Sequence, residues 1–321
     1  MLDILQVTFP FFALVLCGYV AARRRMLPLE AIGGLNGFVL YFALPAMLYR
    51  FGAETPIARL FDPAVLAVWL PCALLMVAIT VRFSRGRGLV WNDAAFGALV
   101  AAFPNTGFMG VPLLIALLGA AAAGPTIATI LIDMVITTSV CVALSRLDGA
   151  GQRGAAEAAR KALKGVALNP LPWAILLGGL SSALALRPVA PIMGTIELLA
   201  DAASPVALFT IGAVLARSQL LAAEAERQAP QAREFLPVAL AKLLLHPLLV
   251  LGVGALARWL GLPLDAFSLG VLVLVAALPS ASNVAMLAER YGADTGRIAR
   301  IILLTTAASF FSFSAAVALM K

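Results

Sequence analysis

Long apolar stretches alternate with short polar ones along the whole chain of 321 residues. An apolar run of about 18 residues or more can cross a bilayer as a helix, and such runs recur from one end of the chain to the other. We place ten membrane spans at residues 3–22, 31–51, 63–82, 92–118, 124–145, 167–186, 192–215, 235–258, 266–289 and 298–320. The pattern predicts an all-α polytopic membrane protein.

Two of these spans are interrupted in their middle by residues that disfavour a helix. The fourth span carries Pro104 ahead of an Asn-Thr-Gly triplet, and the ninth carries Pro279 ahead of Ser-Ala-Ser-Asn. Proline removes a backbone donor, and glycine lowers helix propensity. Unwound backbone in hydrocarbon costs several kcal/mol per unsatisfied group, so it is tolerated only where it lines a cavity or a site. One broken helix in each half of the chain is typical of a transporter with a central binding site.

The breaks suggest what such a site would bind. The second half of each broken helix begins with N–H groups that lack a helical partner. If the two breaks cross, two half-helix N-termini with partial positive charge meet near the midplane and suit an anion. Proline kinks without a ligand are the alternative. The candidate substrate-binding residues are Pro104, Asn105, Thr106, Gly107, Pro279, Ser280, Ser282 and Asn283, together with Pro45 and Pro205 of spans two and seven.

Weak internal similarity relates the two halves of the chain. Pro45 and Pro205 occupy the same relative place in their spans, and spans four and nine each open with an aspartate, Asp93 or Asp265. Residues 1–145 and 167–321 each hold five of the predicted spans, separated by a polar cytoplasmic linker at 146–166. Because five is odd, the second half must enter the membrane upside down. The expected architecture is two inverted five-helix repeats.

Composition and charge agree with this picture. The chain is 62% hydrophobic and 12% charged, whereas a soluble domain carries about 25% charged residues. Of the 23 lysines and arginines, 17 fall in the loops on one side of the predicted membrane and 5 on the other. The positive-inside rule makes the richer side cytoplasmic and puts both termini outside. We expect an integral protein of the plasma membrane, here a bacterial inner membrane. Its expected partner is the lipid bilayer, and no nucleic acid is expected to bind.

Four ionisable residues lie within the predicted spans: Asp133, Asp201, Lys242 and His246. An intramembrane charge is costly and is by default a functional hypothesis. The two aspartates are candidates for carrying a coupling proton, and the lysine and histidine, four residues apart, share one helix face. The alternatives are structural ion pairs, a lysine that snorkels to the cytoplasmic surface, and a packed core histidine beside a kink.

Enzyme signatures are absent from the sequence. It contains no His-Glu-x-x-His, no Gly-x-Ser-x-Gly and no phosphate-binding loop. The three cysteines, Cys17, Cys72 and Cys141, lie in apolar segments without metal-ligand spacing. We expect no enzyme, no metal site and no cofactor, with coupling to H⁺ or Na⁺ left open.

Several stretches resemble the auxin efflux carrier family, whose bacterial members include malonate-transporter-like proteins. They are Asn-Thr-Gly-Phe-Met-Gly-Val-Pro at 105–112, Asn-Pro at 169–170 with Gly178, Asp-Ala at 201–202 through Gly212, and Leu-Pro-Ser-Ala-Ser-Asn at 278–283 continuing to Ala-Glu-Arg-Tyr-Gly at 288–292. The resemblance implies ten helices in two inverted repeats, with spans four and nine crossing. It also implies a scaffold of spans 1, 2, 6 and 7 and a mobile transport bundle of spans 3, 4, 5, 8, 9 and 10.

Members of that family tend to dimerise through the scaffold and carry organic anions by an elevator-like movement. By motif, Asn105, Pro279, Ser280 and Asn283 would contact the substrate. We therefore expect a secondary active transporter of small organic anions, carboxylates such as malonate or auxin-like acids. A passive channel or facilitator is the alternative.

Overall fold

A computed structural model describes residues 2–60, 62–147, 160, 164, 167–224 and 232–320. Its regular elements are helices, joined by one isolated β-bridge. Among these described residues, seven helical stretches are long and apolar enough to cross a membrane: Gln6–Arg23, Ala31–Glu54, Ile57–Gly86, Ala120–Leu144, Ala190–Arg217, Glu234–Trp259 and Thr295–Met320. The described part of the protein is helical and has several candidate membrane spans, which agrees with the predicted class of polytopic membrane protein.

Three shorter apolar helices, Thr106–Leu118, Pro170–Ala183 and Ala266–Ala277, fall within the predicted spans four, six and nine. Two of them belong to the spans that carry the proline breaks, and a break shortens the continuous helix. The count of ten spans and the inverted repeat stay predictions. Most of the predicted linker at 146–166 lies outside the described residues.

The chain forms two compact units, which are described one at a time. Unit 1 consists of Met1–Asp62, Thr106–Ala128 and Asn169–Arg227, and unit 2 of Pro63–Asn105, Thr129–Leu168 and Gln228–Lys321. The helices of unit 1 are α1 (Leu2–Arg23), α2 (Ala31–Phe38), η1 (Val39–Ala43), α3 (Leu44–Glu54), α4 (Ile57–Leu60), η2 (Thr106–Gly110), α7 (Val111–Leu118), η3 (Ala120–Ala122), most of α8 (Ala123–Ile132), α11 (Pro170–Ala183) and α12 (Ala190–Glu224). The four helices predicted for the scaffold all fall in this unit.

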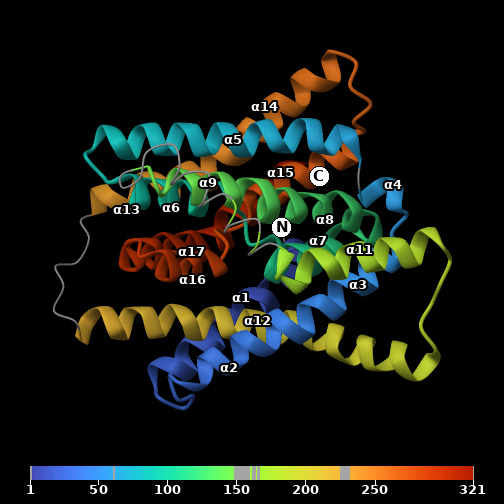
Figure 1. The fold of residues 1–321 in the computed structure, drawn as a ribbon, viewed down its shortest axis with the longest axis horizontal. Helices are drawn as coiled ribbons and strands as arrows, with labels where there is room; N and C mark the ends of the chain where they lie inside the picture. Colours follow the sequence, from blue (N-terminus) through green and yellow to red (C-terminus); the bar gives the residue numbers. More distant parts are fainter. Residues whose placement is uncertain are drawn as a thin grey trace. The chain divides into compact units, whose positions relative to one another are not determined.

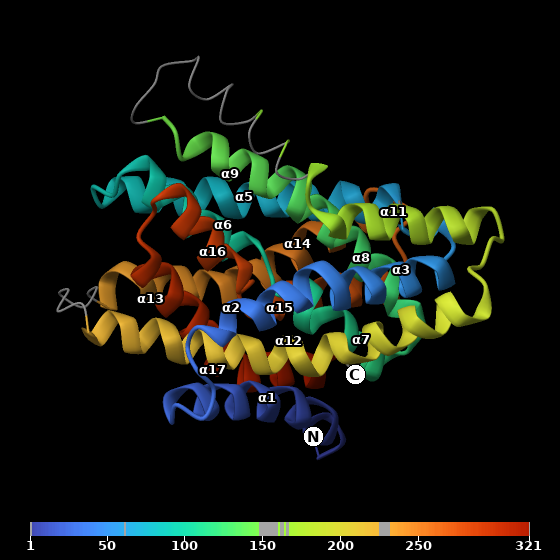
Figure 2. The ribbon, with the colours of Figure 1, turned by 60° about the horizontal axis from the view of Figure 1, so that its bottom comes forward.

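Glycines allow the helices of unit 1 to pack closely. Helix α1 runs beside α12, and α3 beside α11 (Figures 1 and 2). A side-chain carbon at Gly18 would overlap the carbonyl oxygen of Phe209, and one at Gly212 would overlap that of Val15. Small residues bring helix backbones together in membrane proteins, where packing rather than water drives association.

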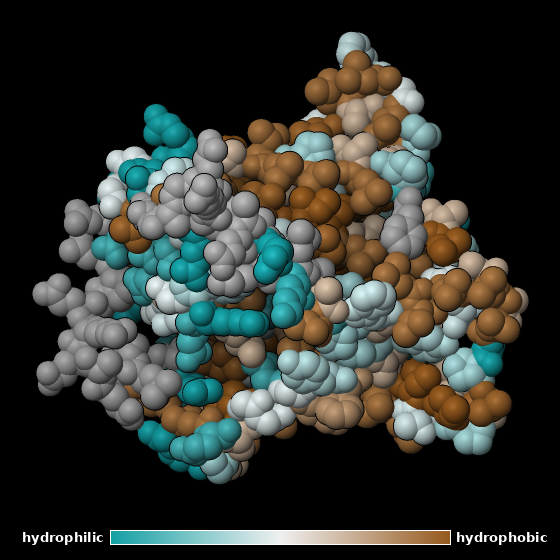
Figure 3. Space-filling view, viewed as in Figure 1, coloured by the Kyte–Doolittle hydropathy of each residue, from teal (hydrophilic) through white to brown (hydrophobic). Residues whose placement is uncertain are grey.

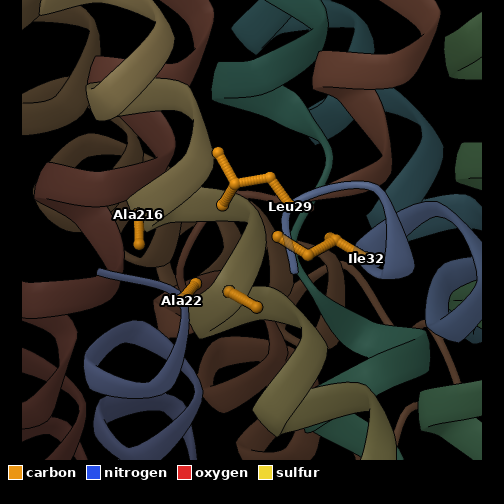
Figure 4. Close-up of a cluster of buried hydrophobic side chains, with 5 residues drawn as sticks. Ala22, Leu29, Ile32 and Ala216 are labelled. Carbon is orange, nitrogen blue, oxygen red and sulfur yellow. The ribbon is translucent and has the colours of Figure 1, made fainter. Parts of the chain in front are cut away.

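A small apolar cluster closes one end of unit 1. Figure 4 shows Leu29 and Ile32 pointing toward Ala216 of α12 and Ala22 near the end of α1. These side chains are buried, together with Ala213. The cluster holds the turn between α1 and α2 against the long helix α12.

Unit 2 is built from the remaining helices: α5 (Pro63–Gly86), α6 (Trp91–Ala102), η4 (Asp133–Thr137), α9 (Thr138–Leu144), α13 (Ala232–Leu240), η5 (Ala241–Leu245), α14 (His246–Trp259), α15 (Ala266–Ala277), α16 (Asn283–Tyr291) and α17 (Thr295–Met320). Within it α5 packs on α6, α14 on α15, and α13 on α17. Apolar residues cover much of α5 and α14 in Figure 3, whereas polar ones gather where α5 ends. This distribution fits helices whose outer faces contact lipid.

Candidate functional site

The two predicted breaks meet within unit 2. Helix α6 ends at Ala102 and α15 at Ala277, and the residues after them take an extended backbone. Pro104 and Ser280 then form an antiparallel bridge. The N–H of Asn105 donates to the carbonyl of Pro279 at 2.8 Å, and the N–H of Ala281 donates to the carbonyl of Phe103 at 3.0 Å. We call residues 103–105 and 278–283 the crossover.

Pairing within the crossover occupies backbone donors that two separate broken helices would leave free for a ligand. Besides the two N–H groups already paired, the N–H of Ser280 donates to the Thr305 hydroxyl at 3.2 Å. At the start of α16, the N–H groups of Val284 and Ala285 bond to the carbonyls of Ala281 and Ser282. These five donors therefore satisfy part of the broken backbone itself. The polar side chains of the breaks are further groups that can contact a ligand.

Two side-chain oxygens at the breaks are buried without a hydrogen-bond partner among the described residues. They are Ser280 Oγ and Asn283 Oδ1. Asn105 is also buried, and Ser282 is half-buried. A buried polar atom that makes no hydrogen bond costs about 1–3 kcal/mol. A bound polar molecule would remove that cost, which makes these side chains the strongest ligand-binding candidates of the crossover.

The other candidate substrate residues belong to unit 1. Thr106 and Gly107 begin the π-helical turn η2, directly after the crossover in the chain. Pro45 lies at the start of α3, which continues from α2 and η1 without a break, so its missing N–H removes a helical hydrogen bond. Pro205 lies inside α12. The site described here therefore consists of unit 2 residues alone.

A buried charged cluster lies next to the end of α15. The Lys242 side chain is 0% exposed, and its ammonium lies 3.0 Å from His246 Nδ1. It also donates to the carbonyl oxygen of Ala276 at 2.8 Å, in the last turn of α15. Because the C-terminus of a helix carries partial negative charge, the hydrogen bond from Lys242 stabilises the first half of the broken helix, the more so when the amine is protonated. Complete burial excludes the snorkelling alternative for Lys242.

Asp133 is the buried acid of the same unit. Its Oδ1 accepts hydrogen bonds from Trp69 Nε1 at 3.2 Å and from the Thr137 hydroxyl at 3.0 Å. Its Oδ2 has no hydrogen-bond partner among the described residues, and neither has His246 Nε2. The Trp69 ring also packs against the His246 ring, with 5.3 Å between centroids. One indole thus contacts both the acid and the histidine.

Each of these charged residues lies in or beside a local π-helical turn. Asp133 opens η4, and Lys242 lies inside η5, which ends just before His246. Single π-helical turns inside α-helices are frequent at functional sites. The three ionisable residues are candidates from the sequence alone, whereas Trp69, Thr137 and Thr305 are not. Uncharged residues inside an apolar helix carry no local sign of the contacts they make.

Asp201 differs from Asp133 in its surroundings. Its side chain is 70% exposed and accepts a hydrogen bond from the Arg50 guanidinium at 2.7 Å, within unit 1. An exposed ion pair of this kind contributes about 0–1 kcal/mol. The contacts of Asp201 favour the structural ion pair over a coupling role.

Comparisons with known proteins identify the family. A family model described as membrane transport protein matches residues 3–317. A protein of Rhizobium meliloti (strain 1021) described as a "Putative malonate transporter" is 31% identical over 309 residues, which cover 95% of this chain and 92% of that protein. The uncharacterized transporter YfdV of Escherichia coli (strain K12) is 28% identical over 294 residues, covering 89% and 88%.

A plant protein matches over a shorter part. Auxin efflux carrier component 8 of Arabidopsis thaliana is 25% identical over 153 residues, which cover 46% of this chain and 42% of that protein. The matched proteins are transporters rather than enzymes, as expected from the sequence. The chain therefore belongs to the membrane transport protein family, the family of the auxin efflux carriers.

Proposed function

We propose that this transporter moves small organic anions, carboxylates such as malonate or auxin-like acids, and binds them at the crossover. The observation that carries the proposal is the buried, unpartnered hydroxyl of Ser280, beside two broken helices. A hydroxyl donates a hydrogen bond to a carboxylate, and an amide does so through its NH₂ group. The name of the Rhizobium meliloti relative points to the same class of substrate.

The donors of the crossover are neutral, which suits a carrier. Hydrogen bonds from a hydroxyl and amides, together with the partial charge of the α16 N-terminus, attract an anion without a full countercharge. A carrier must release its substrate on the far side of the membrane, so moderate affinity is an advantage. The Asn105 amide, also buried at the crossover, completes the proposed set of donors.

We propose an elevator-type mechanism of secondary active transport. In this mechanism a bundle holding the crossover slides against a scaffold of spans 1, 2, 6 and 7, which also forms a homodimer. The division of the chain supports the proposal in part, because those four spans share one compact unit and the crossover lies in the other. Residues 106–128, from spans four and five of the expected bundle, belong to the unit of the scaffold spans. The ten-span inverted topology and the bacterial inner membrane belong to the same proposal.

We propose further that Asp133, Lys242 and His246 form the place where a coupling proton is exchanged. The three side chains are fully buried in unit 2, and both Asp133 Oδ2 and His246 Nε2 lack a partner among the described residues. Lys242 connects this cluster to the last turn of α15, just before the crossover. A change of charge at the cluster would therefore alter the electrostatic interaction with the end of α15 that leads into the substrate site.

Counterflow in proteoliposomes tests the function. Vesicles loaded with unlabelled malonate are diluted into labelled malonate, and a panel of other carboxylates is used in the same way. A carrier accumulates label transiently, and the initial rate saturates with external substrate. A channel equilibrates label without overshoot and without saturation, which would contradict the proposal. The Ser280→Ala variant should lose affinity, which connects transport to the crossover.

A further inference from the structure

A pocket of about 480 Å³ opens at one end of unit 2, apart from the crossover residues. It is lined by Phe83, Ser84, Arg87, Leu89, Glu234 and Arg297. Its wall comes from the last turn of α5, the loop that follows, and the first turns of α13 and α17. Basic residues concentrate at this end of α5, which the positive-inside rule predicts to be cytoplasmic. The pocket therefore lies where lipid headgroups of the inner leaflet are expected.

One wall of the pocket is a buried arginine with neutral hydrogen-bond partners. Arg297 is 2% exposed, and its Nε donates to the Glu234 carbonyl at 2.9 Å, while its Nη1 donates to the Asp93 carbonyl at 3.0 Å. The Asp93 and Asp294 carboxylates each accept a backbone N–H. Within the described part of the chain, no carboxylate lies at salt-bridge distance from this guanidinium. The Asp93, Asp294 and Glu234 carboxylates act on this buried cation only from beyond contact distance. A bound anion would supply the direct charged contact that the described residues do not give it.

Two more groups of the wall can bind the same anion. Ser84 is 1% exposed, and its hydroxyl has no hydrogen-bond partner among the described residues. The Arg87 guanidinium lies 4.0 Å from the centre of the Phe83 ring, which holds it at the rim. Guanidinium groups present paired donors that match the oxygens of phosphate. A hydroxyl and two guanidiniums therefore suit a phosphate better than a bare apolar ligand.

The carboxylate of Glu234 narrows the choice of ligand. Glu234 lines the pocket together with the two arginines, and its carboxylate would repel a ligand that carries only negative charge. A ligand with a primary ammonium next to its phosphate would satisfy both signs of charge. The wall thus favours a zwitterion over a simple anion.

An apolar path leads away from the pocket along α5. Leu75, Ile79 and Phe83 are exposed and follow one another at intervals of four residues, which places them on one face of the helix. The last of the three lines the pocket, and the others continue toward the middle of the predicted span. An acyl chain could lie along this face while the headgroup occupies the pocket.

We propose that the pocket binds the headgroup of a zwitterionic phospholipid with a primary amine, phosphatidylethanolamine being the probe of that class. Its phosphate contacts Ser84, Arg87 and Arg297, and its ammonium contacts the Glu234 carboxylate. Because the pocket joins the ends of α5, α13 and α17, the bound lipid stabilises the transporter. The crossover takes no part in this binding.

The test is a thermal unfolding series on purified, delipidated full-length protein in detergent. Four compounds are added separately in increasing amounts: phosphatidylethanolamine, phosphatidylcholine, phosphatidylglycerol and soluble phosphoethanolamine. A ligand that binds only the folded protein raises the unfolding temperature to an extent set by its affinity. Phosphatidylethanolamine should act at lower concentration than the other lipids, because it alone has a charged N–H donor for Glu234. The ammonium of phosphatidylcholine has no N–H, and phosphatidylglycerol offers only neutral hydroxyls. Equal action of all three lipids would overturn the proposal, and an equal effect of soluble phosphoethanolamine would overturn the lipid as its source.

Variants locate the effect in the pocket. Ser84→Ala and Arg87→Gln should each raise the half-effective concentration of phosphatidylethanolamine, by about tenfold for the charge-assisted contact of the arginine. Glu234→Gln should abolish the preference over phosphatidylglycerol. Arg82→Gln is the matched control, since it removes an exposed arginine near the end of α5, five residues before Arg87, that does not line the pocket. An unchanged lipid response in Arg87→Gln, or an equal loss in Arg82→Gln, would overturn the assignment.

Discussion

At the scale of single residues, Ser280 combines two roles in the crossover. Its backbone pairs with Pro104 and Thr305, while its hydroxyl has no partner among the described residues. The backbone contacts hold the residue in place whatever its side chain is. Removal of the hydroxyl therefore tests ligand binding with little effect on the fold.

We predict that Ser280→Ala and Asn105→Ala each weaken binding of the transported carboxylate by about tenfold, because a hydrogen bond to a charged group contributes roughly 1.5–3 kcal/mol. The measurement is the malonate concentration that half-saturates counterflow. Ser314→Ala is the control, since this buried hydroxyl already donates to the Phe310 carbonyl at 2.6 Å. Unchanged affinity in Ser280→Ala and Asn105→Ala would mean that the crossover is a structural kink.

Asp133 and Asp201 make a matched pair for the coupling hypothesis. We predict that Asp133→Asn abolishes uptake driven by a pH gradient and leaves exchange of labelled for unlabelled substrate in part, because the amide cannot exchange a proton. Asp201→Asn should keep both activities, since its carboxylate is 70% exposed and paired with Arg50. Both activities are measured in the same proteoliposomes. Full pH-driven uptake in Asp133→Asn would place coupling elsewhere or show that transport is uncoupled.

At the scale of elements, the helices of unit 1 depend on glycine contacts. Gly212 of α12 faces the backbone of α1, where any side chain would overlap the Val15 carbonyl. A side-chain carbon at Gly194 of the same helix would meet no neighbouring atom within 4 Å. The two glycines share a helix and differ in what lies next to them.

We predict that Gly212→Ala lowers the unfolding temperature, since α1 must move away from α12, whereas Gly194→Ala leaves it unchanged or raises it. Alanine is favoured over glycine inside a helix by up to about 1 kcal/mol, so the control corrects for propensity. Thermal unfolding in detergent gives both values. An equal effect of the two substitutions would contradict close packing of α1 on α12.

Asp265 caps the first half of the ninth span. Its carboxylate accepts hydrogen bonds from the Ser268 N–H at 2.8 Å and from the Ser268 hydroxyl at 2.7 Å. Burial acts to raise the pKa of Asp265, but these hydrogen bonds outweigh it and hold the pKa below its usual value. A lowered pKa in the folded state means that ionisation stabilises the fold.

We predict that Asp265→Ala costs about 1 kcal/mol at neutral pH, as is usual for a lost N-cap. The contribution is present above the unfolded pKa of about 3.9 and is lost as pH falls through the lower folded pKa. The gap in unfolding temperature between the parent and Asp265→Ala should therefore narrow below about pH 4. Asp265→Ser keeps a cap without a titrating group, so its gap to Asp265→Ala should not depend on pH. A constant gap for the parent would contradict the capping role.

At the scale of the whole molecule, the distribution of basic residues predicts the orientation in the membrane. We predict that a reporter active only in the cytoplasm is silent when fused to the C-terminus and active when inserted within residues 146–166. The physical reason is the 17-to-5 division of lysines and arginines and the cost of moving them across the bilayer. Signal from the C-terminal fusion would reverse the topology.

The sequence by itself determined the class of the protein and the places where its helices break. Apolar runs specify membrane helices because the preference of a segment for lipid over water depends on its own residues. Pro104 and Pro279 interrupt helices because the missing N–H and the ring act on the adjacent turn. The structure has α6 ending at Ala102 and α15 at Ala277, close to those prolines. Family membership followed from the motifs around the same breaks, and the comparisons confirm it.

Only the tertiary structure decided which polar groups stay free and which are satisfied. Pairing of the two breaks consumes N–H groups that a single broken helix would leave open, and it joins residues more than 170 positions apart. The same holds for Lys242, which contacts Ala276, and for Asp133, which contacts Trp69. It also holds for Asp201, whose partner Arg50 lies in another predicted span. Such contacts depend on how helices distant in the sequence pack together. Hydropathy and local spacing do not specify that packing.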